Sequence, residues 1–504
     1  MPREVAPITG SRLAAGVLSR AVARPAGRVL ARAGATVTVS VAILLALVPT
    51  SAHARELWRD GHGGVLEGQA FYKNFVSAVW LQPSLVEGTE AFQSTLDASR
   101  ALVPPEQAAL LPQDVALPPF ALLNAHILRL STTFRFEDRL TFDVAWQVTA
   151  SLSSDSSFSG GASLTGTIGG ASGVRSAQRR LVELSSVLVD EPNLRIEQNL
   201  DRLALKLALP FGDLTVGRQV LSWGTGRLWN PTDVLSPFPP TVVDREVRRG
   251  FDAVRLAVAI DETTQLDLLY LPQPRPEDNG GVARLQANIK GWDASVSFGK
   301  YVSDLVIGAD FVGDVGPVAV HGEGAYTLGL LGLSGGGVSV GEHFFRGVAG
   351  VDWRPHDKLL LMAEYHFNGY GADSPEGYAQ KLSSSRVVRG EVFGAGRHYL
   401  GLAATWMQSE IFSATLSTLV NLADPSVLLV PALEYSFEQS VLVRAGGYVP
   451  LGARPDETVF ASLTPEDVVT VSDALVTARR TLGLKSEYGS STWGAFVQVG
   501  LYLP

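Results

Sequence analysis

The chain has 504 residues, no cysteine, 51 glycines and 28 prolines, and only 18% of its residues are charged. Its mean hydropathy is nevertheless positive, at +0.16. Soluble proteins seldom combine these features, whereas a transmembrane β-barrel does, because each strand faces lipid on one side and water on the other. The formal net charge of −9 argues against nucleic-acid binding, which depends on a basic surface.

The N-terminal residues have the order of an export signal. Six arginines and one acidic residue lie within residues 1–34, and Ala35–Val48 is uncharged and mostly apolar. Small residues at 52 and 54 then mark a cleavage site. The apolar run is shorter than the roughly 20 residues that a spanning helix needs, which favours a cleaved signal peptide over 1–54 and not an anchor. The exported part, 55–504, keeps 35 basic and 49 acidic residues.

Short segments with alternating apolar and polar residues follow one another through this exported part. Most are about 10 residues long, which is the length that a tilted strand needs to cross a bilayer. The first, over 65–79, alternates weakly, and the Pro-rich stretch 80–120 after it has a short helix near 90–102. The other predicted strands cover 123–136, 139–150, 203–209, 214–221, 251–260, 264–271, 282–290, 292–300, 303–312, 317–327, 343–353, 358–368, 396–407, 411–421, 426–437, 441–449 and 478–503.

The connections between these segments differ in length between the two rims, although the rim with the long ones also holds two short connections, 301–302 and 422–425. With 65–79 as the first strand and 478–503 as one last strand, the count is 18 and every even-to-odd connection is short. The long connections then share the opposite rim: 80–122, 151–194, 222–250, 328–342, 369–395 and 450–476. Omitting 65–79 and splitting the last segment at Tyr488-Gly489 also gives 18 strands, but it places both ends on the long-loop rim.

This pattern predicts an all-β fold, an antiparallel transmembrane β-barrel of about 18 strands with short periplasmic turns and long external loops. One face of the strands carries charges of both signs, which water in a lumen tolerates and lipid does not. A barrel of this size usually leaves a channel; the alternative is a solvated wall of structural ion pairs. The charged residues expected to line a pore are Arg129, Arg135, Lys206, Arg255, Arg284, Lys290, Asp310, Glu323, Arg346, Glu364, Glu434 and Arg444.

One long connection, 222–250, is rich in Gly, Trp and Pro, which end the strand pattern. It is also the candidate constriction of the pore, because folded inward it would set opposed charges across the lumen. The alternative is an external loop held by its own salt bridges. Its charged residues are Arg227, Asp233, Asp244, Arg245, Glu246, Arg248 and Arg249.

The stretch 217–233, GRQVLSWGTGRLWNPTD, also carries a family resemblance. It resembles a motif of largely uncharacterised Gram-negative outer-membrane β-barrel proteins, in which GRQ, WG-x-G and WNP-T-D follow one another. Ser486-Glu487-Tyr488-Gly489 is similar to that family as well, and porin and polysaccharide-export barrels share the pattern more loosely. The resemblance implies a porin-like protein of the cell outer membrane. Its expected partners are outer-membrane lipid, the outer-membrane assembly machinery and a small polar solute, with no nucleic acid.

Signals for chemistry are weak. Residues 332–336 match G-x-S-x-G, but no helix follows, as a nucleophile elbow requires. His321 with Glu323, and Glu364 with His366, share a face and could form a metal or acid–base cluster, although such residues are more often part of a wall. We therefore predict no enzyme, catalytic residue, metal or cofactor. The predicted function is passive passage of small polar or charged solutes; the alternatives are a lipolytic enzyme and a structural or adhesive barrel.

Overall fold

The computed structural model describes residues 55–60, 62–102, 116–155, 180–334, 337–382, 384–388, 390–437, 440–455 and 484–503. The signal peptide expected over 1–54 lies outside these residues. From Ser51 onward the chain forms one compact unit. Among the described helices, none is long and apolar enough to span a membrane.

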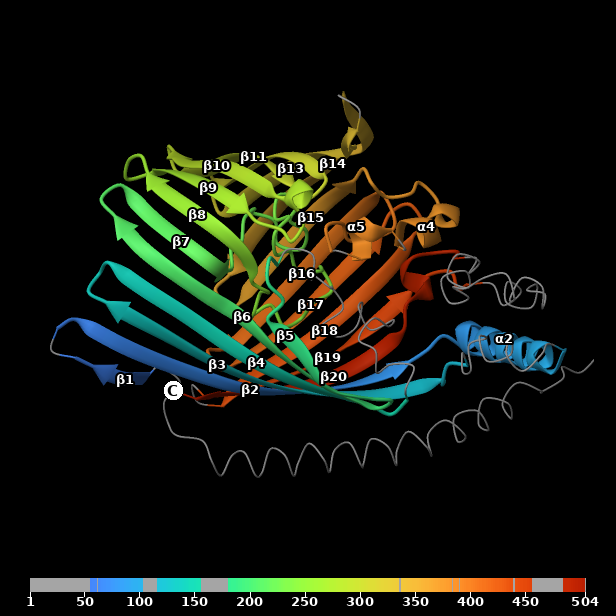
Figure 1. Ribbon diagram of the computed structural model, residues 1–504. Helices are drawn as coiled ribbons and strands as arrows, with labels where there is room; N and C mark the ends of the chain where they lie inside the picture. The colour runs from blue at the N-terminus through green and yellow to red at the C-terminus, as the bar shows by residue number, and fades with distance from the viewer. Residues whose placement is uncertain are drawn as a thin grey trace, which may run out of the picture. The chain divides into compact units, whose positions relative to one another are not determined.

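Strands dominate the described residues (Figure 1). They are β1 (Arg55–Arg59), β2 (Gly64–Trp80), β3 (Phe120–Phe136), β4 (Leu140–Ser153), β5 (Ser185–Glu191), β6 (Leu194–Leu209), β7 (Gly212–Gln219), β8 (Phe251–Ala259), β9 (Thr264–Leu271), β10 (Gly280–Ile289), β11 (Trp292–Tyr301), β12 (Asp304–Val315), β13 (Val318–Ser334), β14 (Gly337–His356), β15 (Leu359–Asn368), β16 (His398–Ser409), β17 (Phe412–Asn421), β18 (Ser426–Phe437), β19 (Val441–Leu451) and β20 (Trp493–Leu503). The helices are α2 (Pro83–Leu102), α4 (Tyr378–Leu382) and α5 (Ser385–Val388), and 3-10 turns are η4 (Pro276–Asp278), η5 (Pro375–Gly377) and η6 (Tyr488–Ser490).

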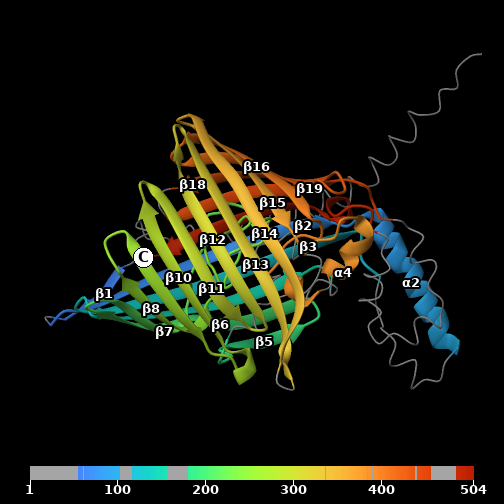
Figure 2. The ribbon, with the colours of Figure 1, turned by 90° about the horizontal axis from the view of Figure 1, so that it is seen from above.

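Eighteen of the described strands close a ring. Neighbours along the chain pair antiparallel, β4 skips β5 to pair with β6, and β20 returns to β2 over Ala70↔Leu503 to Trp80↔Trp493. The two remaining strands lie outside the ring. β1 pairs with the part of β2 that β20 does not reach, and β5 pairs with the part of β6 that β7 does not reach. The fold is therefore the closed antiparallel barrel that the alternation predicted, with a tilted strand arrangement that Figures 1 and 2 show from two sides.

The structure chooses between the two ways of counting 18 strands. The first expected strand is present as β2, which runs one residue beyond 65–79 at each end. The last one is shorter than expected, since only Trp493–Leu503 is strand and η6 lies before it. Residues 484–492 instead make polar contacts with other connections at the long-loop rim, and 478–483 lie outside the described residues.

In the described residues, four of the expected long connections contain regular structure. The stretch 151–194 contains β5, and 369–395 contains η5, α4 and α5. Residues 328–334 and 337–342 continue the β13–β14 hairpin, with irregular register at Leu328/Leu330 and Leu330/Leu333. Between 80 and 120, the helix α2 is longer than the predicted short helix and covers 20 residues.

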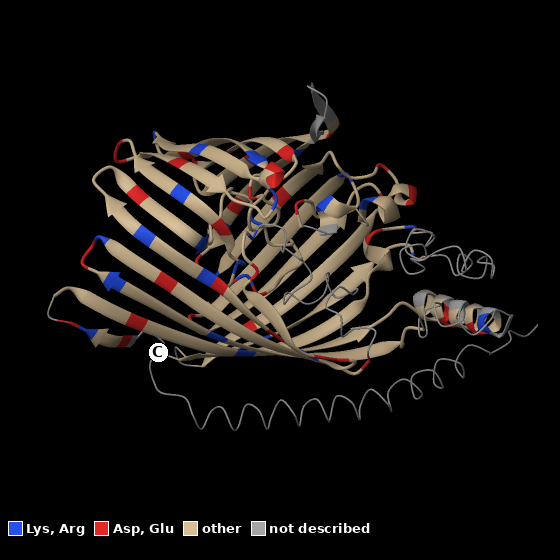
Figure 3. Cartoon of the chain, in the orientation of Figure 1, with Lys and Arg blue, Asp and Glu red and all other residues tan. Residues whose placement is uncertain are grey.

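The two faces of the barrel wall differ in chemistry. On the outer face, large apolar side chains such as Val296, Phe298 and Ile307 are about half exposed. On the inner face of the same strands, polar side chains such as Ser295 and Asp310 are buried. Figure 3 shows that charges of both signs are spread along the strands. This apolar-out, polar-in arrangement suits a wall between lipid and water.

Exposed aromatic residues lie near both ends of the strands. Phe136, Phe211, Trp353, Trp406 and Phe437 lie near the short turns. Tyr270, Tyr326, Tyr365 and Trp493 lie toward the rim of the long connections. Two such bands are the usual aromatic girdles of outer-membrane barrels. Trp223 and Trp229 do not belong to them, because both are buried in the connection between β7 and β8.

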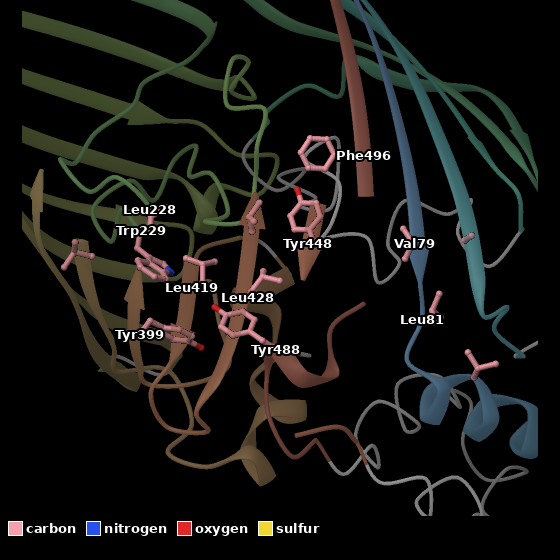
Figure 4. Packing of buried hydrophobic residues seen from close by; sticks show 14 of the residues in the cluster. Val79, Leu81, Leu228, Trp229, Tyr399, Leu419, Leu428, Tyr448, Tyr488 and Phe496 are labelled. Carbon is pink, nitrogen blue, oxygen red and sulfur yellow. The ribbon is translucent and has the colours of Figure 1, made fainter. Parts of the chain in front are cut away.

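Most of the hydrophobic core lies inside the barrel, and one of its clusters also includes Val86 and Leu96 of α2. One cluster joins Leu228 and Trp229 to Tyr399, Leu419 and Leu428 of the wall (Figure 4). A second joins other residues of the same connection, including Val234 and Leu235, to the inner faces of β8–β13. The barrel interior is thus largely packed where this connection meets the wall.

Candidate functional site

The connection between β7 and β8, residues 220–250, is called here the inner loop. β7 ends at Gln219 and β8 begins at Phe251, and between them the chain enters the barrel interior (Figure 1). Contacts with inward side chains on both sides of the barrel define its path. On one side it binds β13 and β15, and on the other it binds β2 and β20.

A carboxylate of β13 holds the first part of the inner loop. Glu323 Oε2 accepts the backbone N–H groups of Thr225 (2.9 Å) and Gly226 (3.1 Å). Its Oε1 accepts the backbone N–H of Thr232 (2.6 Å) and the hydroxyl of the same residue (2.8 Å). The loop thus wraps one buried carboxylate with three peptide N–H groups.

A carboxylate of β15 holds the next residues in the same way. Glu364 Oε2 accepts the backbone N–H of Arg227 at 2.7 Å, and Oε1 accepts those of Leu228 and Trp229 at 3.1 and 2.9 Å. His321 Nε2 donates to Oε2 from β13 at 3.1 Å. Both glutamates are buried, so these bonds replace the water that an ionised carboxylate requires.

The sequence of the inner loop explains why it can bend around two carboxylates. Gly224 has a φ of +89°, and a Cβ there would lie 2.6 Å from Glu323 Oε2. A Cβ at Gly226 would lie 1.9 Å from the carbonyl oxygen of Trp229. The two glycines are therefore required by close approach. The ring of Trp229 stacks on His366, with centroids 5.2 Å apart, and fixes the far end of this turn.

The end of the inner loop crosses to the strands that close the barrel. Asp244 Oδ2 accepts from Lys73 Nζ of β2 (2.7 Å) and from Gln498 Nε2 of β20 (2.6 Å). Glu246 Oε2 accepts from the same Lys73 Nζ (2.6 Å) and from the Tyr502 hydroxyl of β20 (2.7 Å). Burial acts to raise the pKa of Asp244, but the Lys73 ammonium outweighs it and holds that pKa below its ordinary value.

The predicted arginines of the inner loop have separate partners. Arg227 pairs with Asp352 of β14 at 2.9 Å and is the most exposed of these ion pairs, with 48% of its side chain accessible. Arg248 pairs with Asp233, and Arg245 donates to the carbonyls of Arg227, Pro240 and Val242. The Ser236 hydroxyl donates to the carbonyl of Arg249.

The predicted pore-lining residues lie mostly in cross-strand pairs on the inner face. The pairs are Arg129–Asp201 (2.6 Å), Arg135–Glu67 (2.8 Å), Lys206–Asp213 (2.7 Å), Arg255–Asp267 (2.7 Å), Arg284–Asp310 (3.5 Å) and Arg444–Glu434 (2.6 Å). Lys290 is misplaced by the sequence pattern, because it lies exposed in the turn after β10 with a φ of +54°. Arg346 donates to the carbonyls of Pro231 and Glu391, and thereby joins the inner loop to the β15–β16 connection.

The four residues considered as a metal or acid–base cluster have structural partners. His321 donates to Glu364, Glu323 binds the inner loop, and His366 lies 3.1 Å from the carbonyl of Gly347. In the part of the chain that the structure describes, no group of three or more His, Cys, Asp or Glu could hold a metal. Of the G-x-S-x-G stretch, residues 335–336 lie outside the described residues, and Gly337 resumes a strand.

Several contact residues escape the sequence pattern. Lys73 sits in the weakly alternating first strand, so its inward direction has no clear signal. Asp201 and Arg202 both face inward, because the register shifts opposite Ala145/Trp146 and both contact inner groups. Such a bulge breaks the period of two on which the prediction of faces depends. In the sequence, the signal for this bulge is the pair of adjacent opposite charges, Asp201 and Arg202, within an otherwise apolar alternation.

No protein-family model and no curated protein matches the chain. Among solved structures, it is similar to OccK9 (OpdG) of Pseudomonas aeruginosa, with 9% identity, a TM-score of 0.48, and coverage of 88% of this chain and 100% of that one. OccK5 (OpdH) of the same organism has 9% identity, a TM-score of 0.46, and coverage of 87% and 98%. A BenF-like porin of Pseudomonas fluorescens has 8% identity, a TM-score of 0.46, and coverage of 87% and 98%.

Proposed function

We propose that this chain forms a passive channel of the cell outer membrane, in which the inner loop narrows the path of small polar or charged solutes. The observation that carries this proposal is the inner loop itself, which crosses the interior and is fastened to opposite walls. The apolar outer face and the two aromatic bands support a membrane position.

The charge arrangement favours selective rather than unrestricted passage. Most inward charges form cross-strand pairs and largely cancel, so the wall itself has little net field. Arg227 is half exposed on the inner loop beside Asp352, where a solute would meet it at the narrowing. Fixed charges at a restriction focus the field and sort ions by sign.

Planar-bilayer recording of the refolded protein tests the channel. We expect ohmic, ion-selective conductance steps after insertion. Insertion without conductance, together with ester hydrolysis by the purified protein, would instead support the lipolytic alternative. Insertion with neither activity would support a structural barrel.

Neutralising the arginines of the inner loop tests its role in selectivity. Replacing Arg227, Arg245, Arg248 and Arg249 by Gln removes four positive charges, so the reversal potential in a salt gradient should shift toward cation preference. Arg59→Gln is the control, because Arg59 pairs with Glu56 on β1, outside the ring. An unchanged reversal potential in the fourfold variant would show that the loop does not line the path.

A further inference from the structure

We propose that Glu323 and Glu364 are the positioning residues of the inner loop, and that the motif over 223–233 is a double receptor for these two wall carboxylates. The inference rests on the proposed channel, in which the path of the loop sets the width of the pore. It adds to that proposal a reason why the loop lies where it does.

The two glutamates and the loop backbone satisfy most of each other's hydrogen-bonding groups. Residues 225–232 lie in a barrel interior without regular pairing, where backbone N–H groups need partners. Six of these N–H groups end on the two glutamates, three on each. Within the described residues, neither carboxylate has a Lys or Arg at ion-pair distance, so peptide dipoles and two side-chain donors supply most of its stabilisation.

Each motif residue has a task in this arrangement. Gly224 and Gly226 allow the backbone to approach the Glu323 carboxylate and its own turn. Thr232 returns to the same carboxylate with both its N–H and its hydroxyl. Trp229 donates its backbone N–H to Glu364, as Arg227 and Leu228 do, and it packs its ring on the wall. The spacing of WG-x-G and WNP-T therefore matches two carboxylates on β13 and β15.

The wall is built to present these carboxylates. His321, Gly350 and Glu364 lie in one cross-strand row over β13, β14 and β15. A Cβ at Gly350 would lie 2.2 Å from His321 Nε2. The missing side chain on the middle strand therefore lets the His321 ring pass over it and donate to Glu364. His321 has no described contact with the loop backbone, so it acts through Glu364.

The test replaces both carboxylates and follows the position of the loop. Four arginines at 227, 245, 248 and 249 make the inner loop cleavable by trypsin once it leaves the lumen. In Glu323→Ala/Glu364→Ala, we expect cleavage after these arginines and a larger unit conductance, whereas the wild type resists cleavage there. Heat-dependent mobility on SDS gels reports in each case whether the barrel is closed.

Glu434→Ala is the matched control, because Glu434 is an inner-wall carboxylate that bonds Arg444. It should resist trypsin as the wild type does. A closed double variant that is as resistant as the wild type and has the same conductance would overturn the inference. If the double variant does not close, the single variants Glu323→Gln and Glu364→Gln, which keep the side-chain volume, are read by the same criterion.

The outcomes for the channel and for this inference are separable. Wild-type protein that inserts without conducting would contradict the proposed channel, while the proteolysis pattern would still decide whether the two glutamates position the loop. Gly350→Val gives a further readout. It should expose the loop to trypsin although both carboxylates remain, because it displaces His321; full resistance in a closed Gly350→Val barrel would remove His321 from the mechanism.

Discussion

At the scale of single residues, one buried carboxyl at the long-loop rim joins the segment before β20 to the β15–β16 connection and to the strands β16 and β17. Glu487 Oε1 accepts from the Ala395 N–H at 3.0 Å, and Oε2 accepts from the Tyr399 hydroxyl at 2.5 Å and from Asn421 Nδ2 at 2.8 Å. Burial raises the pKa of Glu487, and the nearby Asp424 carboxylate adds to the shift. The folded protein therefore binds the proton of this carboxyl more tightly than the unfolded chain does.

The sign of this shift predicts how pH acts on stability. Because the folded pKa lies above the unfolded value, the folded state binds the proton more tightly, and ionisation of Glu487 costs stability. That cost is absent below about pH 4.5, the ordinary carboxyl range, and grows as pH rises through the folded pKa. Glu487→Gln should therefore lose less thermal stability than the wild type between pH 4.5 and 8, as followed by thermal unfolding in detergent.

The control is Glu376→Gln in the β15–β16 connection, which Glu487 contacts through Ala395 and where the Glu376 carboxyl is exposed. This change should not reduce the fall in stability with pH. Equal pH slopes for wild type and Glu487→Gln would contradict a raised pKa at Glu487.

At the scale of an element, β16 shows how a strand accommodates the inner loop. Gly401 faces inward, and a Cβ there would lie 2.2 Å from Leu228 Cδ1 and 2.8 Å from Trp229 Cζ3. The same holds for Gly308 of β12, where a Cβ would lie 2.9 Å from Thr232 Cγ2. Glycines in these strands weaken the sheet, yet each provides the space that the loop occupies.

Filling one of these spaces should displace the loop. Gly401→Val should destabilise the protein by about 1–3 kcal/mol, because overpacking forces neighbouring side chains to move. Trp229 should then shift its emission to longer wavelength as water reaches it. Gly281→Ala in β10 is the control, since a Cβ there meets only ordinary contact at 3.5 Å. Unchanged emission and stability in Gly401→Val would show that Leu228 and Trp229 do not rest on β16.

At the scale of the whole barrel, the inner loop joins the first and last strands of the ring. Lys73 of β2 lies between Asp244 and Glu246, and these two carboxylates also bond Gln498 and Tyr502 of β20. Only 4% of the Lys73 side chain is exposed. The contacts therefore reinforce the pairing that closes the barrel.

Removing this ammonium should weaken closure. Lys73→Met leaves two carboxylates without their cation, and removing one partner of a buried ion pair costs about 3 kcal/mol or more. The temperature at which the folded band disappears on SDS gels should fall. Lys206→Met is the matched control, because the Lys206–Asp213 pair is about 40% exposed and should contribute less than about 1 kcal/mol. An equal fall in this temperature in the two variants would refute a special role for Lys73 in closing the barrel between β2 and β20.

How far the sequence predicts this molecule depends on the range of each interaction. Alternation is a local property, so the strands, the 18-strand count and the polar inner face follow from it. Cross-strand partners such as Arg444–Glu434 lie within one hairpin and are close to predictable. The prediction of Lys290 as a wall residue is wrong, because β10 ends at Ile289 and Lys290 lies in the turn that follows. Glu323 and Glu364 were found as wall residues, but their loop partners lie about a hundred residues away in sequence.

The sequence by itself determined the barrel, because lipid and water impose a period of two on every strand, and it singled out the stretch 217–233 by its Gly, Trp and Pro content. Only the tertiary structure decided where that stretch goes. The direction of a loop depends on bonds between distant groups, here six peptide N–H groups and two carboxylates. No local sequence pattern shows which loop N–H groups will meet which wall carboxylates, because the two sets of residues are far apart in the sequence.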